Sequence, residues 1–227
     1  MSRSEVIRYL ILRSIGNFLL LFAIFGVLAT FGPALYYEVH FRIAQLRGIH
    51  YSVVDQPKQI TTGVSSGGFA QVLTGPKEQI LIPIDTDFDV LIPKIGANAR
   101  IFPNVDASNP NVFLSILKEG VAHAQGTFFP GQKGNIYLFA HSTDNFWDVG
   151  RYNAIFYLLK DLKPGDDVVV FAQNVRHNYK VKNSVILNPS EVSYVTNAKT
   201  GKELLILQTC WPPGTAWQRL LVFAEPK

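Results

Sequence analysis

The chain has 227 residues, 48% of them hydrophobic, and a formal net charge of +4 at pH 7. This length holds one sizeable hydrophobic core and an accessory segment, whereas two full domains would be cramped. Residues 1–60 contain six Lys/Arg and three Asp/Glu, which leaves fifteen basic and fourteen acidic residues in the remainder. The remainder is therefore nearly neutral, and because it offers no basic surface for a phosphate backbone we expect no nucleic-acid partner.

An uncharged apolar segment, residues 14–37, lies near the N-terminus. With about 1.5 Å of rise per residue, such a helix would reach roughly 36 Å and cross the hydrocarbon layer with some tilt. A cleaved signal peptide and a buried helix are the alternatives, but the segment exceeds a usual signal-peptide core and no Ala-x-Ala site follows it. We expect an uncleaved transmembrane anchor over residues 14–37, in contact with the lipid bilayer.

The charges that flank this segment predict its orientation. Three arginines and one glutamate precede it, and two arginines and one glutamate follow it within ten residues. The positive-inside rule therefore favours a cytoplasmic tail of residues 1–13. We expect a single-pass protein of the cell membrane with its C-terminal domain on the extracytoplasmic side.

A connecting segment, residues 38–77, follows the predicted anchor. Residues 38–50 can continue as a helix, whereas residues 55–77 are rich in Gly, Ser, Thr, Gln and Pro. This second composition is typical of a flexible spacer, which would hold the following domain off the bilayer. The globular domain is then predicted to occupy residues 78–227.

Short β-type runs separated by turn residues fill the chain from residue 80 onward. Two short amphipathic stretches, residues 111–119 and 152–159, predict helices. Many short strands with a few helices indicate a mainly β domain, either a closed barrel or a sandwich. The predicted strands are residues 79–84, 88–95, 135–140, 167–172, 179–187, 203–209 and 219–224.

The chain has one cysteine, Cys210. A single thiol cannot form an internal disulfide, so this residue is either a buried small hydrophobe or a reactive group. It follows a run of bulky apolar residues and precedes Trp-Pro-Pro-Gly, which must end the strand. Cys210 is thus expected at the mouth of a loop. If this strand pairs with the next one as a hairpin, Cys210 and Arg219 face each other across its open end.

A nucleophilic thiol needs a partner, because only the thiolate is a strong nucleophile and a free thiol with a pKa near 8.5 supplies little of it. His141 ends a predicted strand and, like Cys210, lies where a buried strand opens into a loop. His123 is the second candidate. The other three histidines lie in the juxtamembrane part or in a surface turn and are expected to be solvated: His40, His50 and His177.

Several segments, all in the same order, resemble the sortase family of cysteine transpeptidases. Gly120-Val-Ala-His and Pro130-Gly-Gln-Lys-Gly-Asn resemble the Gly-x-x-His and Pro-Gly-x-x-Gly-Asn motifs that lead to the family's catalytic histidine, here His141. Leu207-Gln-Thr-Cys is similar to the family's Leu-x-Thr-Cys, and Arg219 falls at the position of its arginine. Val90-Leu-Ile-Pro-Lys-Ile resembles an early strand. The resemblance runs from about residue 80 to residue 227.

This resemblance implies a closed eight-stranded β-barrel with a three-residue site. Cys210 would be the nucleophile, His141 the general acid, and Arg219 the cation that positions substrate and stabilises the oxyanion. Thr209 would support the substrate cleft, and His123 would be a structural hydrogen-bonding residue. The implied substrates are secreted proteins with a C-terminal Leu-Pro-x-Thr-Gly-like signal, and the implied acceptor is an amine, such as that of a cell-wall precursor or a pilin lysine.

Two departures from the family pattern leave the subclass open. Ile206 stands where many members have Thr, and Ala140 stands where Gly is common. A pilin-polymerising sortase usually carries an N-terminal lid with an Asp-Pro-aromatic plug, which Asp55-Gln-Pro-Lys does not reproduce. Two further alternatives are a catalytically idle membrane-tethered binding barrel and a plain cysteine hydrolase.

The sequence supports no cofactor and no metal site. Calcium stays open as an alternative, but no pattern of carboxylates supports it. Asp144 and Asp148 follow His141, and loop acids of this kind are usually solvated.

Overall fold

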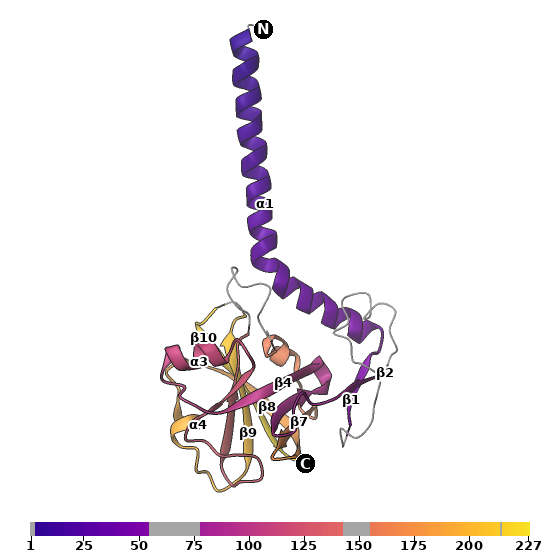
Figure 1. Ribbon diagram of the computed structural model, residues 1–227, viewed down its shortest axis with the longest axis vertical. Coiled ribbons are helices and arrows are strands. Elements are labelled where there is room, and N and C mark those ends of the chain that lie inside the picture. The colour runs from indigo at the N-terminus through magenta and orange to yellow at the C-terminus, as the bar shows by residue number, and fades with distance from the viewer. Residues whose placement is uncertain (1–2, 55–77, 143–154, 214) are drawn as a thin grey trace.

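The computed structural model describes residues 3–54, 78–142, 155–213 and 215–227. The predicted spacer, residues 55–77, lies outside this description, as do Asp144 and Asp148. A long N-terminal helix leads to a β-barrel that holds most of the described residues (Figure 1).

Eight strands close into a barrel in the order β10-β8-β7-β3-β4-β5-β6-β9. The mainly β fold with a closed eight-stranded barrel is therefore confirmed. Most neighbours pair antiparallel, whereas β4 with β5 and β6 with β9 pair in parallel. The strands are β3 (Phe88–Ile92), β4 (Ala97–Val105), β5 (Val121–Ala124), β6 (Asn135–Phe139), β7 (Asp167–Ala172), β8 (Val175–Leu187), β9 (Leu204–Trp211) and β10 (Gln218–Pro226).

The barrel has apolar residues on both faces of several strands. Side chains alternate along a strand, so Leu205 and Leu207 of β9 fill the interior while Ile206 points outward. Outside β6, β9 and β10 a second apolar cluster packs under two short helices, α3 (Pro110–Ile116) and α4 (Ser193–Thr196). On this covered outer face, residues of β6, β9 and β10 line a pocket.

Several predicted elements differ from the structure in their bounds. The strand predicted over residues 79–84 is β2 (Glu78–Leu81), which lies outside the barrel, and the strand predicted over residues 179–187 begins at Val175. The helix predicted over residues 111–119 begins one residue earlier, because Asn109 caps it by accepting a hydrogen bond from Asn111 N (3.1 Å) and Pro110 occupies its first turn. The helix predicted over residues 152–159 falls partly outside the described residues, and its described part is the 3₁₀ helix η3 (Tyr157–Asp161). A second 3₁₀ turn, η1 (Pro93–Ile95), follows β3.

The N-terminal helix α1 (Arg3–Leu46) is longer at both ends than the predicted anchor. Its part from Arg3 to Ala29 is long and apolar enough to cross a membrane, by length and composition. The helix bends partway, and its C-terminal part turns toward the barrel (Figure 1). Strand β1 (His50–Val53) follows and pairs in parallel with β2 (Glu78–Leu81).

Residues 38–53, which we call the collar, are docked on the barrel. Phe41 is buried against Tyr157 and Leu158 of η3. Tyr51 and Val53 pack on an outer apolar patch of Leu81, Leu91, Val169 and Phe171. The juxtamembrane segment is therefore packed against the domain, a contact that its sequence did not predict.

Candidate active site

The hairpin of β9 and β10 places two of the candidate residues opposite each other. Cys210 and Arg219 are partners in the antiparallel register, one residue pair inside the last pair, Trp211 and Gln218. Directly opposed residues project on the same face of a sheet. The predicted pairing of Cys210 with Arg219 is thus confirmed, and strand β9 ends one residue beyond the cysteine.

His141 reaches the same region through the parallel pairing of β6 with β9. Phe139 is the partner of Gln208, and Ala140 N donates to Gln208 O (3.2 Å) just beyond β6. His141 follows β6 by two residues and Cys210 follows Gln208 by two residues on β9, and both side chains line the same pocket. Thr209, between Gln208 and Cys210, is buried, and its Oγ1 donates to Ala140 O (3.2 Å). Thr209 therefore ties β9 to the residue that precedes His141.

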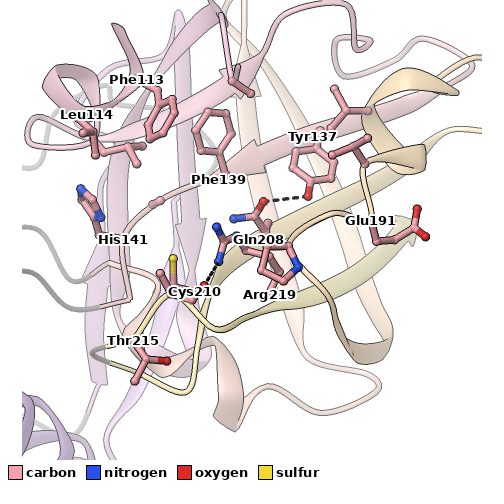
Figure 2. A pocket seen from close by; sticks show the side chains of 17 residues that line it. Phe113, Leu114, Tyr137, Phe139, His141, Glu191, Gln208, Cys210, Thr215 and Arg219 are labelled. Atoms are coloured by element: carbon pink, nitrogen blue, oxygen red, sulfur yellow. Dashed lines mark hydrogen bonds between the residues drawn. The ribbon is translucent and has the colours of Figure 1, made fainter. Parts of the chain in front are cut away.

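A pocket of about 580 Å³ lies on this outer face and is lined by all three of Cys210, His141 and Arg219 (Figure 2). Its walls are mostly apolar. Polar groups are few, as is common for ligand pockets that use a small number of placed donors and acceptors. The other lining residues come from α3, β6, β9 and the β8–β9 connection and include Phe113, Leu114, Tyr137, Phe139, Glu191, Val192 and Gln208.

The guanidinium of Arg219 is held by its own loop. Its Nη1 donates to Ala216 O (3.1 Å) and to Gln218 O (3.0 Å). Among the described residues its other nitrogens have no protein acceptor, so they can donate to a ligand in the pocket. A thiol, an imidazole and a guanidinium with spare donors around one apolar pocket form a set suited to acyl transfer.

His123 is buried and does not line this pocket. Its Nδ1 accepts a hydrogen bond from Asn104 N (3.3 Å), which leaves Nε2 to donate to Phe128 O (2.9 Å). Burial lowers the pKa of His123, although the bond to Phe128 opposes the shift. A neutral imidazole with both nitrogens bonded fits the structural role expected for this residue.

The Gly-Asn turn before β6 holds one wall of the pocket in place. Asn135 N donates to Ala198 O (2.7 Å), and its Nδ2 donates to Tyr194 O (3.0 Å). Both acceptors belong to the β8–β9 connection, which supplies Val192 and Val195 to the pocket. Gly134 packs against the ring of Phe128 so closely that a Cβ would overlap it. The motif therefore carries a packing role besides leading to His141.

Two pocket residues were not singled out from the sequence, Tyr137 and Gln208. Tyr137 Oη donates to Gln208 Oε1 (2.9 Å) across the floor of the pocket. The sequence did carry a signal for Gln208. It is a polar residue two positions before Cys210, on the same face of an otherwise apolar strand. Within the described ranges, no three His, Cys, Asp or Glu side chains are grouped so as to hold a metal ion.

Comparison with known proteins agrees with this architecture. Sortase D of Bacillus subtilis (strain 168) is 27% identical over 137 residues, which cover 59% of this chain and 60% of that protein. Sortase C-1 from Actinomyces oris is 28% identical, with a TM-score of 0.53 over 63% of this chain and 76% of that chain. Clostridium perfringens sortase C, solved with the C-terminal cell wall sorting motif, is 26% identical, with a TM-score of 0.51 over 61% and 69%.

The match to a family model covers more than half of the chain. The model describes the sortase domain, and it matches residues 90–227, which include every barrel strand except the first two residues of β3. The chain therefore belongs to the sortase family.

Proposed function

We propose that the protein is a membrane-anchored cysteine transpeptidase that cleaves a Leu-Pro-x-Thr-Gly-like signal in secreted proteins and transfers the acyl group to an amine. Membership of the sortase family implies a transpeptidase. The observation that carries the finer proposal is the register that sets Cys210 opposite Arg219, with His141 on the same pocket. The Clostridium relative was solved with a cell wall sorting motif, which supports a substrate of this class.

In the proposed reaction Cys210 Sγ attacks the scissile carbonyl, a carbon–sulfur bond forms, and the carbonyl oxygen takes up negative charge. Arg219 stabilises that charge with its remaining N–H groups. His141 gives its proton to the departing amine as the carbon–nitrogen bond breaks, which leaves a thioester on Cys210. An incoming amine then attacks the thioester, loses its proton to His141 and releases the thiolate.

The proposed organisation follows the same division of the chain. Residues 1–13 form a cytoplasmic tail, residues 14–37 the transmembrane anchor, residues 38–77 the juxtamembrane segment and spacer, and residues 78–227 the catalytic domain. The apolar helix α1 supports the anchor. Tags at the two ends of the chain should then lie on opposite faces of the membrane. Protection of a C-terminal tag from protease in intact cells would contradict this topology.

The test of the activity uses the full chain in detergent, a library of sorting-signal peptides, and several amines with mass-spectrometric detection. We expect cleavage and an amide with one class of amine, and no product from Cys210→Ala. A cell-wall-type amine as preferred acceptor supports anchoring, a lysine side chain supports pilin polymerisation, and water alone indicates a hydrolase. No product with any peptide would leave the idle binding barrel as the better hypothesis.

A second measurement tests whether His141 acts with Cys210. The rate of thiol alkylation is followed against pH for the wild type and for His141→Ala. We expect the two profiles to differ, and His141→Ala to lose transpeptidation. Identical profiles with full transpeptidation in the variant would show that the two residues do not act together.

A further inference from the structure

One amide interrupts the apolar floor of the pocket. On the outward face of β9, Gln208 lies between Ile206 and Cys210, and its neighbours on the flanking strands are Phe139 and Leu221. An amide in such surroundings is unfavourable unless its polar atoms find partners. The position therefore calls for a reason beyond filling space.

Tyr137 fixes which way this amide points. Tyr137 is 5% exposed, and burial raises the pKa of its hydroxyl, although the charge of Arg219 opposes the shift. The hydroxyl thus stays protonated and donates to Gln208 Oε1 (2.9 Å). Because the oxygen is engaged, the amide nitrogen must face elsewhere.

The nitrogen of Gln208 lies on the side of Arg219 (Figure 2). Within the described part of the chain, it has no acceptor. It therefore adds two N–H groups to those that Arg219 leaves unused beside Cys210. Two sets of unused N–H groups that lie close together suit the carbonyl oxygens of a peptide backbone.

The spacing relates these donors to the reacting bond. Gln208 and Cys210 are two residues apart on one strand, which is about 6.6 Å. Two residues of an extended peptide span the same length. A carbonyl about two residues from the scissile carbonyl therefore reaches Gln208 when a peptide lies extended along β9.

We propose that Gln208 is a substrate-binding residue whose amide nitrogen donates to a main-chain carbonyl on the acyl side of the sorting signal, and that Tyr137 is a positioning residue acting through Gln208. This inference rests on the proposed function. The proposed hydrogen bond is to the substrate main chain. It therefore governs how the acyl side of the sorting signal is held in the pocket, and not which substrate side chains the enzyme prefers.

The test is a thioamide scan, because sulfur in place of a carbonyl oxygen is a weak acceptor. Each acyl-side amide of a cleavable peptide is replaced in turn, and kcat/KM is measured for the full-length wild type and for Gln208→Leu. At one position we expect the thioamide to lower the wild-type value about tenfold, as for one lost hydrogen bond. Gln208→Leu should start about tenfold lower with the parent peptide and show no further loss at that position.

Two variants separate recognition from structure. Gln208→Glu keeps the size and can still accept from Tyr137, but has no donor, and it should lose the same coupling. Tyr137→Phe should weaken the coupling and raise KM with little change in kcat. Gln125→Leu, an exposed glutamine in the turn after β5, is the matched control and should retain the wild-type pattern.

The outcomes distinguish the two proposals. Equal thioamide effects in the wild type and in Gln208→Leu would overturn the role of Gln208 while the proposed function stands. No turnover of any peptide by the wild type would overturn the proposed function and this inference with it. If Gln208→Leu fails to fold, Gln208→Glu gives the same comparison, and an unchanged scan in that variant would contradict the inference.

Discussion

The site and the collar are joined to the same barrel in different ways. The site residues lie on or directly after β6, β9 and β10, which are hydrogen-bonded to one another in fixed register. The collar touches the barrel through side chains, and its strand β1 pairs only with β2, outside the barrel. Cys210 and Arg219 cannot separate unless the sheet opens, whereas the collar can leave without breaking a barrel strand pair. The proposed catalytic residues thus lie on the rigid part, and the proposed anchor is joined to the barrel through a part that can open locally.

The largest expected effect belongs to the site. Arg219→Lys keeps the positive charge but loses the planar set of N–H donors. In the wild type, two hydrogen bonds from Nη1 to the loop fix the orientation of this set. We expect kcat to fall on the order of 10²- to 10³-fold, as for a lost oxyanion donor, with a smaller change in KM. Steady-state kinetics with a cleavable peptide measures this. A wild-type kcat in the variant would mean that charge alone suffices and that the fixed geometry does not matter.

Asp89 of β3 is covered by the chain that leads from β2 to β3. Its titration tests how tightly that chain is held against the barrel. Asp89 is fully buried; its Oδ2 accepts from Ile84 N (2.8 Å), and among the described residues its Oδ1 has no hydrogen-bond partner. Burial raises its pKa to about 7, although the bond from Ile84 opposes the shift. An unfolded aspartate has a pKa of about 3.9. Between these values the native state binds more protons, so stability should fall as the pH rises from 4 through 7.

Urea unfolding at pH 5 and pH 8 measures this effect. We expect the wild type to lose stability on the order of a few kcal/mol between these values, and Asp89→Asn to lose much less. Asp87→Asn, at an exposed neighbour, is the control and should behave like the wild type. If Asp89→Asn keeps the wild-type pH dependence, water reaches the Asp89 carboxyl in solution, and the chain between β2 and β3 does not stay packed over it.

Strand β7 shows what made much of the barrel predictable. It was predicted with its observed bounds, because an unbroken apolar run ends at Gln173 and Asn174, which turn with positive φ. The facing of Cys210 and Arg219 followed from two strands joined by a short loop. Local patterns of this kind are sufficient wherever a strand is apolar and its turn residues are explicit.

Strand β4 shows why other elements were missed. Ala97, Ala99 and Ile101 alternate with polar residues, but two of these three inward residues are small alanines, so the alternation is weak. Pro103 and Asn104 are residues typical of turns and interrupt the pattern further. Strand β5 has only four residues. The collar and the bond between Tyr137 and Gln208 could not be predicted for a different reason, since both depend on contacts between residues far apart in the chain, to which single-sequence patterns are blind.

Removing the collar tests whether it belongs to the folded unit. Residues 78–227 alone should fold and be soluble, because all eight barrel strands remain. The loss of Tyr51 and Val53 exposes the patch that includes Leu91 and Phe171. We expect residues 78–227 to be about 2 kcal/mol less stable toward urea than residues 35–227, which retain the collar. Equal stability would mean that the collar does not dock in solution, and a failure to fold would make it part of the core. A gain in activity would instead favour an inhibitory cover.

The smallest expected effect concerns the ion pairs that fasten the collar. Glu38 accepts from Lys160 (2.8 Å) and from Arg42 (2.8 Å), and all three side chains are partly exposed. The bond from Lys160 is the main reason that the pKa of Glu38 lies below its ordinary value, and burial opposes it. The pairing therefore stabilises docking above the ordinary glutamate pKa, about 4.3, and is lost as the pH falls through the lowered value.

Glu38→Gln should weaken docking by about 0.5 kcal/mol near neutral pH, since exposed pairs are screened. Amide hydrogen exchange over residues 38–53 measures this, with Glu119→Gln, an exposed residue outside the collar, as the control. The variant should exchange faster in the collar alone, lose its extra sensitivity to acid, and turn over a soluble peptide at the wild-type rate. A slower rate with that peptide would show that the collar and the site are coupled, because among the residues that the structure describes the ion pairs of Glu38 are with Arg42 and Lys160, neither of which lines the pocket.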